Sequence, residues 1–281
     1  MPEDSQARKL ARDARERAVA FLERSFVGRC IYRFIELESV DRALALSSRA
    51  FVAIIPLAIV ASALSPSGES FGERTVDRFE LEGAAAQAMR QLFAAPSDVR
   101  GAVSVVGLVA LIVTSVSLGR MIQRTFERIW ELPSEGPRGI LRALTWIGAF
   151  ALWLAVVVPI RNVLQDLGLP GLDLVVTVAS STALWVWTPY VLLGGRIGWR
   201  DLLPSALATG IGLSVLTAAS VIYLPGTIER AAEAYGLIGV TFAFVSWLFT
   251  TALVIIGATI VGAEAVQRPR RVARPPADGV D

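Results

Sequence analysis

An uncharged stretch of 30 residues near the C-terminal end constrains this chain more than any other feature. It lies between Glu233 and Glu264, and from Tyr235 it reads YGLIGVTFAFVSWLFTTALVIIGATIVGAE. At about 1.5 Å of rise per residue, a helix of this length reaches about 45 Å, which exceeds the ~30 Å hydrocarbon core of a bilayer. A soluble core has no need for a helix so long and so apolar. We therefore predict a membrane span over residues 235–264.

The composition favours several spans. Of the 281 residues, 54% are hydrophobic. They come in blocks of about 20 residues, where a soluble helical protein would show stripes of 3.6-residue period. We predict five further spans, at residues 43–64, 101–118, 140–160, 172–193 and 202–224. The predicted fold class is all-α, a polytopic membrane protein with six transmembrane helices.

Charged segments flank this membrane domain, which we place at residues 25–266. Residues 1–24 mix acids and bases, so we expect a solvated helix or a frayed tail in the cytoplasm. Residues 267–281 are rich in Pro and Arg, and we expect disorder there. Residues 25–39 repeat apolar side chains at helical spacing with arginines on the other sides. This pattern predicts an amphipathic interfacial helix, and packing against a partner helix is the alternative.

The positions of Arg and Lys predict the orientation of the spans. Of the 27 such residues, 20 lie in the two termini and in the connections after the second and fourth spans, whereas six lie in the other connections. Positive residues are enriched on the cytoplasmic side of membrane proteins. Both termini are therefore predicted to be cytoplasmic.

Two connections are expected to contain helix. In the outer connection at 65–100, Ala85 and Met89 belong to a helical stripe, which predicts a short amphipathic helix over the mouth of the bundle. In the inner connection at 120–138, a similar apolar stripe predicts that the second span continues into the cytoplasm as an amphipathic extension.

The titratable residues form no recognisable catalytic or metal-binding pattern. The chain has no histidine, has one cysteine, Cys30, and lacks a phosphate loop of the GxxxxGK[ST] type. Glu127, Glu131 and Glu135 recur every four residues among arginines, which is typical of a solvated helix face. We therefore predict no enzymatic activity, no catalytic residue, no metal, no cofactor and no nucleic-acid partner.

Arg49 is the charged residue that lies well inside a predicted span, and it is the first candidate for substrate binding. A charge in the hydrocarbon costs about 2.5–3.5 kcal/mol on insertion scales and is often functional. Arg49 would bind an anionic headgroup or gate a polar cavity, with Glu264 as its partner; the alternative is that it snorkels to lipid phosphates. Pro56 is a second candidate, because a kinked helix opens backbone groups to a cavity, and a static bend is the alternative.

A stripe of small residues marks one face of the fifth predicted span. Ala206, Gly210, Ser214 and Ala218 recur every four residues. Such a stripe allows two helices to approach closely. We predict helix packing along it, with a substrate-lining face as the alternative.

Four stretches taken together resemble the YihY/BrkB family of bacterial inner-membrane proteins. They are LALSSRAFVAIIPLAIV, RTFERIWELP, GRIGWRDLLPSALATG, and AYGLIG followed by Trp247 and a closing Gly-Ala pair. The likeness covers roughly residues 26–266. Ser205 departs from it, since the family tends to have Gly there. The family's closing Gly-Ala-Glu aligns with either residues 257–259 or residues 262–264.

The resemblance implies an envelope-integrity protein of the inner membrane, in contact with membrane lipids. It further implies a transporter-like protein that moves or exposes an amphipathic or anionic envelope component such as lipid. Members have also carried an older label as ribonuclease BN, which the residues of this chain do not support. The alternative function is a membrane scaffold that recruits partners through the cytoplasmic segments 1–24, 120–138 and 268–281. The substrate and the oligomeric state are left open.

Overall fold

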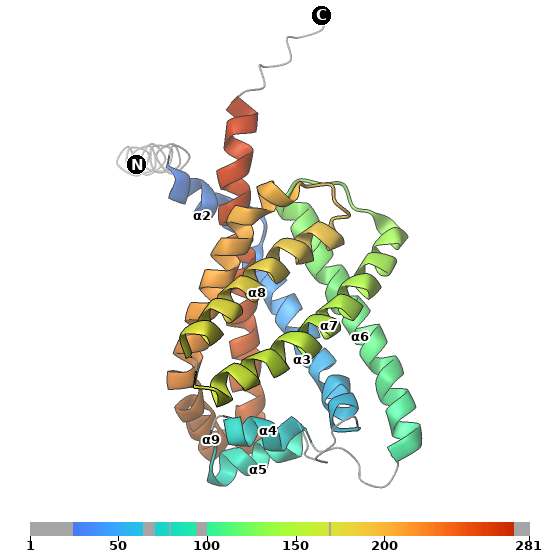
Figure 1. The fold of residues 1–281 in the computed structure, drawn as a ribbon, viewed down its shortest axis with the longest axis vertical. Helices are drawn as coiled ribbons and strands as arrows, with labels where there is room; N and C mark the ends of the chain where they lie inside the picture. Colours follow the sequence, from blue (N-terminus) through green and yellow to red (C-terminus); the bar gives the residue numbers. More distant parts are fainter. Residues whose placement is uncertain (1–24, 64–70, 79, 94–99, 169, 273–281) are drawn as a thin grey trace, which may run out of the picture.

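The computed structural model of the chain describes residues 25–63, 71–78, 80–93, 100–168 and 170–272 (Figure 1). Every regular element in these ranges is a helix, so the predicted all-α class is confirmed. The elements are α2 (Phe26–Glu36), α3 (Ser39–Ala63), α4 (Phe71–Arg78), α5 (Gly83–Leu92), α6 (Arg100–Ile129), the 3-10 helix η1 (Gly136–Arg138), α7 (Gly139–Asp166), α8 (Pro170–Leu192) and α9 (Trp199–Val272).

The segments predicted to flank the membrane domain are described only in part. The N-terminal segment 1–24 and residues 273–281 of the tail lie outside the described residues. Residues 267–272, where we expected disorder, continue α9 as helix. The amphipathic helix predicted at 25–39 corresponds to α2, whose first turn is capped by Ser25: its Oγ accepts from the backbone N–H of Gly28 at 2.8 Å.

α9 is a helical hairpin whose two halves meet at Gly236 (Figure 1). Gly236 has φ 58° and ψ −137°, a backbone conformation that residues with a Cβ atom rarely adopt. The halves then run antiparallel in close contact. A Cβ atom added at Gly262 would lie 2.3 Å from the Cα of Ser205, and one at Gly212 would lie 2.7 Å from a methyl group of Val254. The contacts pair residue 205 with 262 and residue 212 with 254, so the two halves run in opposite directions.

The remaining long helices close a bundle with α9. α3 packs against α6 and α9, α8 packs against α7 and α9, and α6 packs against α7. The order around the bundle is therefore α3, α6, α7, α8 and α9. A buried core fills the end that carries α2, and among its members are Phe126, Ile129, Leu192, Ile256 and Ile260. We call this end the α2 end; it comprises α2, the α6–α7 connection at 130–138 and the α8–α9 turn at 193–198.

The opposite end of the bundle is covered by α4 and α5 (Figure 1). Ala85 and Met89 of α5 are buried against α9, and the ring of Phe93 meets that of Phe244 with 6.1 Å between centroids. α5 is the short helix that we predicted in the outer connection, whereas α4 was not predicted. The hairpin residues 225–234, which we had placed between two spans, are helical, and α5 packs against this end of the hairpin.

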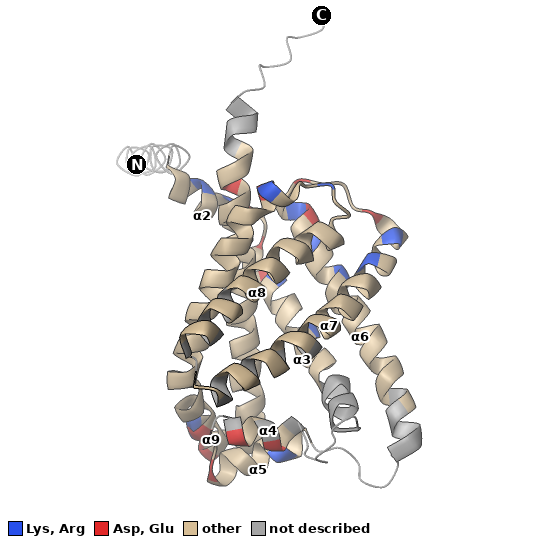
Figure 2. Cartoon of the chain, in the orientation of Figure 1, with Lys and Arg blue, Asp and Glu red and all other residues tan. Residues whose placement is uncertain are grey.

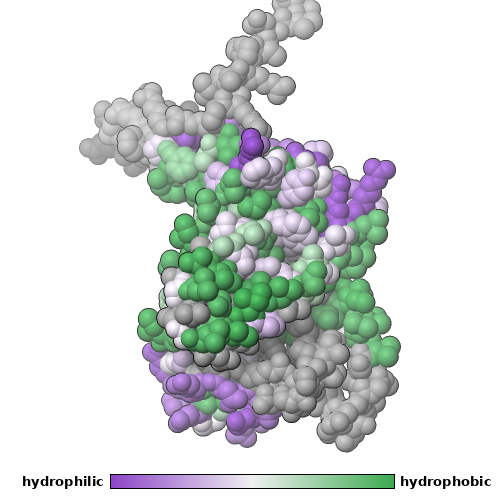
Figure 3. Space-filling model, viewed as in Figure 1, coloured by the Kyte–Doolittle hydropathy of each residue, from purple (hydrophilic) through white to green (hydrophobic). Residues whose placement is uncertain are grey.

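Each of the long helices α3, α6, α7, α8 and α9 carries exposed apolar side chains, and Figure 3 shows them over the middle of one face of the bundle. Charged residues gather at its two ends (Figure 2). The exposed fraction is 85% for Ile222, 62% for Val113 and 65% for Leu152. A contiguous apolar surface of this kind marks contact with lipid or with another protein. Within the described residues, a single stretch, Trp199–Gln267, is long and apolar enough to cross a membrane, and Gly236 divides it. The six-span topology stays a prediction.

We expect Gly239→Ala to destabilise the hairpin, because the new Cβ atom would lie 2.0 Å from the carbonyl oxygen of Ala231. Relieving this clash would separate the two halves of α9, at the cost of about 1–3 kcal/mol that is typical of overpacking. The midpoint of thermal unfolding of the detergent-purified protein measures the loss. Gly226→Ala is the matched control, since a Cβ atom there meets nothing within 4 Å and alanine favours helix. An equal midpoint for both variants would contradict the hairpin geometry.

Candidate functional site

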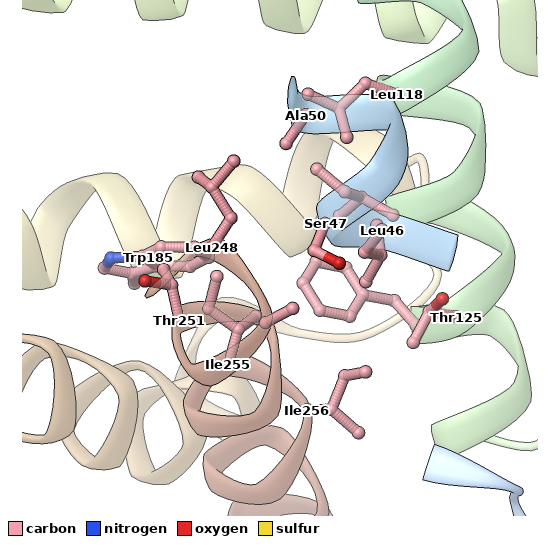
Figure 4. Close-up of a pocket in the computed structure, with 13 residues that line it drawn as sticks. Leu46, Ser47, Ala50, Leu118, Thr125, Trp185, Leu248, Thr251, Ile255 and Ile256 are labelled. Atoms are coloured by element: carbon pink, nitrogen blue, oxygen red, sulfur yellow. The ribbon is translucent and has the colours of Figure 1, made fainter. Parts of the chain in front are cut away.

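An apolar cavity of about 150 Å³ lies inside the bundle where α3, α6, α8 and α9 meet (Figure 4). Three of its lining residues carry hydroxyls, namely Ser47, Thr125 and Thr251. Each hydroxyl donates to a carbonyl oxygen of its own helix at 2.9 Å. Because these hydroxyls already have acceptors, the cavity wall is apolar, and it suits the tail of an amphipathic molecule. The other lining residues are Leu46, Ala50, Leu118, Ile122, Phe126, Trp185, Leu248, Ala252, Ile255 and Ile256.

The walls of this cavity come from segments far apart in the sequence. In Figure 4, Leu46 and Ser47 of α3 face Thr251 and Ile255 of α9, and Trp185 of α8 lies at one side. No local sequence pattern brings these positions together. The hairpin in α9 does so, because it returns the chain along the bundle beside α3.

Arg49 is next in sequence to a residue that lines this cavity. It is ten residues into α3, about 15 Å along the helix, and it directly precedes the lining residue Ala50. Its Nη1 donates to the carbonyl oxygen of Ser117 at 3.3 Å and to its Oγ at 3.2 Å. Ser117 in turn directly precedes Leu118, another lining residue. The guanidinium thus bridges α3 and α6 while the side chain stays exposed, so an anionic group can approach it.

Glu264 is buried and pairs with α2. Arg33 Nη1 donates to Glu264 Oε1 at 2.7 Å, and Arg29 Nε lies 3.6 Å from Oε2. The predicted pairing of Glu264 with Arg49 is therefore wrong. Arg33, 231 positions away in the sequence, is the partner, because α2 packs against the last turns of α9.

Arg33 joins three helices at the α2 end. Besides Glu264 of α9, it donates through Nη2 to the carbonyl oxygen of Ile129 and pairs with Glu131 at 3.0 Å, just after α6. Nη1 also donates to Gln267 at 2.9 Å. The arginine is only 6% exposed, so all of its partners lie within the protein.

The orientation of α2 is the reverse of that of a soluble amphipathic helix. Arg33 faces the protein, whereas Val27, Ile31 and Ile35 are exposed, up to 70% for Ile35. An outward apolar face beside an inward-facing arginine is the arrangement expected of a helix that lies in a membrane interface.

A second buried network holds the connection between α6 and α7 to the turn between α8 and α9. Glu127 is 2% exposed and accepts from Arg196 Nη2 at 2.8 Å. Gln123, fully buried, donates to the same carboxylate at 3.2 Å. Glu135 lies 3.3 Å from Arg196 Nε and also pairs with Arg142 of α7.

This network corrects one prediction from the sequence. We had assigned Glu127, Glu131 and Glu135 to a solvated helix face. That assignment is wrong for Glu127 and for Glu135, whose side chains are 3% and 14% exposed; the side chain of Glu131 is 56% exposed. The reason is that the α8–α9 turn folds over this face and brings Arg196 to it. The alternating charges indicated ion pairing, but they did not indicate a partner 69 positions away.

The residues of the predicted small-residue stripe are not among those that line the cavity. Ala206 and Gly210 are buried, and a Cβ atom at Gly210 would lie 3.3 Å from Thr182 Oγ1 of α8. Ser214 is half-buried and donates to its own helix at 2.8 Å, and Ala218 is exposed. Contact with a neighbour is therefore seen over the first part of the stripe.

Pro56 lies within α3, six residues beyond the lining residue Ala50. Side chains in that part of α3 are outside the described set, so its predicted role in substrate binding stays a prediction.

Cys30 of α2 lies outside the predicted spans, and the pKa of its thiol is shifted by burial and by the ion pair between Arg33 and Glu264. Burial raises the pKa of its thiol, and the nearby Glu264 carboxylate raises the pKa further. Arg29 and Arg33 act in the opposite direction. The thiol therefore carries less thiolate at neutral pH than an ordinary cysteine and reacts more slowly.

Comparison with protein families agrees with the sequence resemblance. The family model described as Virulence factor BrkB matches residues 30–279. The chain belongs to the BrkB virulence factor family. Comparison with curated proteins and with solved structures gives no match. Membership, together with the long apolar stretch of α9, indicates a membrane protein associated with the cell envelope.

The stretches that resemble other BrkB-family members now have physical roles. RTFERIWELP contains Glu127 of the buried network, and GRIGWRDLLP contains its partner Arg196. AYGLIG contains the hairpin residue Gly236. Of the two candidates for the closing Gly-Ala-Glu, residues 262–264 provide both a close helix approach and a paired acid, whereas a Cβ atom at Gly257 meets nothing within 4 Å.

We expect Glu127→Ala to destabilise this BrkB-family protein by about 1–3 kcal/mol, because it leaves the buried Gln123 without this acceptor and removes one of the two carboxylates that pair with Arg196. Glu131→Ala is the control; its exposed carboxylate should cost about 1 kcal/mol or less. Retention of the monodisperse peak in size-exclusion chromatography after heating compares the two. Equal heat resistance would contradict the buried network.

We expect Glu264→Gln to speed the alkylation of Cys30 by maleimide at pH 7.5. The substitution removes a carboxylate that raises the thiol pKa and loosens α2, so both effects increase reactive thiolate. Glu36→Gln, on an exposed position of the same helix, should leave the rate unchanged. A rate no faster than that of the unmodified protein would contradict both the effect of Glu264 on the thiol and its role in holding α2.

Proposed function

We propose that this BrkB-family protein moves or exposes an amphipathic, anionic lipid of the envelope. One observation carries the proposal: the exposed cation Arg49 and its partner Ser117 are the sequence neighbours of two residues, Ala50 and Leu118, that line an apolar cavity free of unpaired hydroxyls. A molecule with a hydrocarbon tail and an anionic head matches both features. The cavity walls suit the tail, and the guanidinium suits a phosphate because its donors form a planar fork.

The proposal includes a six-span topology in the bacterial inner membrane with both termini in the cytoplasm. Helices α3, α6, α7, α8 and the two halves of α9 supply the spans. The exposed apolar side chains of these helices support it (Figure 3 shows one face). The excess of Arg and Lys in the predicted inner segments supports it as well. The α2 end is then the cytoplasmic end, and the outward apolar face of α2 lies in the inner leaflet.

A scaffold that recruits cytoplasmic partners is less well supported. Of its three proposed recruiting segments, 120–138 is largely engaged within the protein, through Glu127, Glu135 and the buried Phe126. A recruiting surface needs side chains that are free to bind a partner.

Reconstitution tests the lipid proposal. The purified protein is placed in vesicles of phosphatidylethanolamine and phosphatidylglycerol that contain a trace of fluorescent phosphatidylglycerol, and dithionite quenching reports movement between leaflets. We expect the protein to speed this movement. Arg49→Ala should slow it markedly and Arg49→Lys less so, because lysine keeps the charge but loses the fork. Ala50→Phe, which fills part of the cavity, should also slow it.

Arg138→Ala is the matched control, since Arg138 is exposed and lies away from the cavity. It should leave the rate unchanged. No movement with the unmodified protein, or equal rates for Arg49→Ala and Arg138→Ala, would reject the lipid-moving function and favour the scaffold.

A further inference from the structure

A groove with a volume of about 760 Å³ lies on the outer surface of the bundle, between α8 and the first turns of α9. It is separate from the internal cavity, because α8 presents Trp185 to the cavity and Trp187 to the groove. Small side chains line one end of the groove and aromatic ones the other. In order along the chain, these residues are Ala179, Thr182, Ala183, Trp187, Tyr190 and Trp199.

The length of the groove matches one leaflet of a bilayer. Tyr190 lies eleven positions after Ala179 in the helix, which is a rise of about 16 Å. Half of the ~30 Å hydrocarbon core is about 15 Å. Because these residues recur at three- and four-residue spacing, they share one face of α8 and form a continuous channel along it. An acyl chain of a phospholipid fits this length and this apolar lining.

The rim of the groove carries a cation and the aromatic residues that favour a membrane interface. Trp199 and Tyr190 are exposed, and Trp and Tyr are enriched at headgroup level. The guanidinium of Arg200 lies 5.2 Å from the centroid of the Trp199 ring. Arg200 is exposed and lies over the groove-lining Trp199, so it can reach the headgroup of a lipid seated in the groove.

We propose that this groove binds one phospholipid with a net anionic headgroup from the leaflet at the α2 end. Its acyl chain fills the channel between α8 and α9, and Arg200, held over Trp199, binds its phosphate. The site is independent of the cavity beside Arg49 and does not require that the protein moves lipid. The bound lipid acts as a fixed part of the structure that fills the space between two helices.

Photo-crosslinking of the full-length protein tests this site. The protein is reconstituted in phosphatidylethanolamine vesicles that contain a small fraction of phosphatidylglycerol or, in a parallel sample, phosphatidylcholine, each with a photoactivatable group in its acyl chain. Mass spectrometry of peptides then locates the label. We expect phosphatidylglycerol to label residues 179–203 more than phosphatidylcholine does. Arg200→Ala should lower the phosphatidylglycerol label roughly fivefold, as expected for one arginine near an anionic headgroup.

Two further variants make the result specific. Arg138→Ala removes an exposed arginine elsewhere at the α2 end and should leave the label unchanged. Ala183→Trp fills the groove at an exposed position and should reduce the label from both lipids. Equal labelling by the two lipids, insensitive to Arg200→Ala, would mean bulk lipid only and would overturn the proposal. Crosslinks to a second copy of the chain in place of lipid would overturn it as well.

Discussion

Two buried carboxylates at the α2 end determine how the segments there are held together. Glu127 and Glu264 are each less than a tenth exposed, and a buried carboxylate without a cation is costly. Their arginines, Arg196 and Arg33, come from the α8–α9 turn and from α2. Neither pair can form until segments far apart in the sequence have packed. An arrangement in which α2, α6 and α9 are packed incorrectly therefore leaves a buried acid unpaired, and this strongly destabilises it.

Close approach of backbones, rather than charge, holds the hairpin of α9. Gly236 turns the chain, Gly239 allows the second half to start against Ala231, and Gly262 rests on Ser205 near the other end. Between these contacts Trp247 Nε1 donates to Ser220 Oγ at 2.8 Å. The glycine contact at Gly262 lies two residues before Glu264, so this close approach of the two halves also positions the acid for Arg33. Packing and ion pairing thus depend on each other at the α2 end.

The fold was predictable from the sequence wherever the signal was local. Apolar length located the long helices, and an apolar stripe located both α5 and the extension of α6. α4 was missed because it is only eight residues long and mostly polar, although its few apolar side chains share one face. The burial of Glu127 was missed for a different reason: a regular spacing of acids among arginines is the same whether the face meets water or a distant turn. Contact between remote segments, as at Arg33 and at the cavity, has no local signature.

For the lipid-moving function that we propose, the positions of the cavity and the ion-pair network bear on how the lipid would enter the cavity. Phe126 lines the cavity, and its neighbour Glu127 belongs to the network, so passage from the α2 end would have to displace a buried ring and break buried ion pairs. On the side of the bundle the barrier is smaller. Ala50 and Leu118 are only half-buried there, and Arg49 is exposed beside them. This difference favours lateral entry from the bilayer, where an amphipathic molecule already resides, with its head passing Arg49 as its tail enters the cavity.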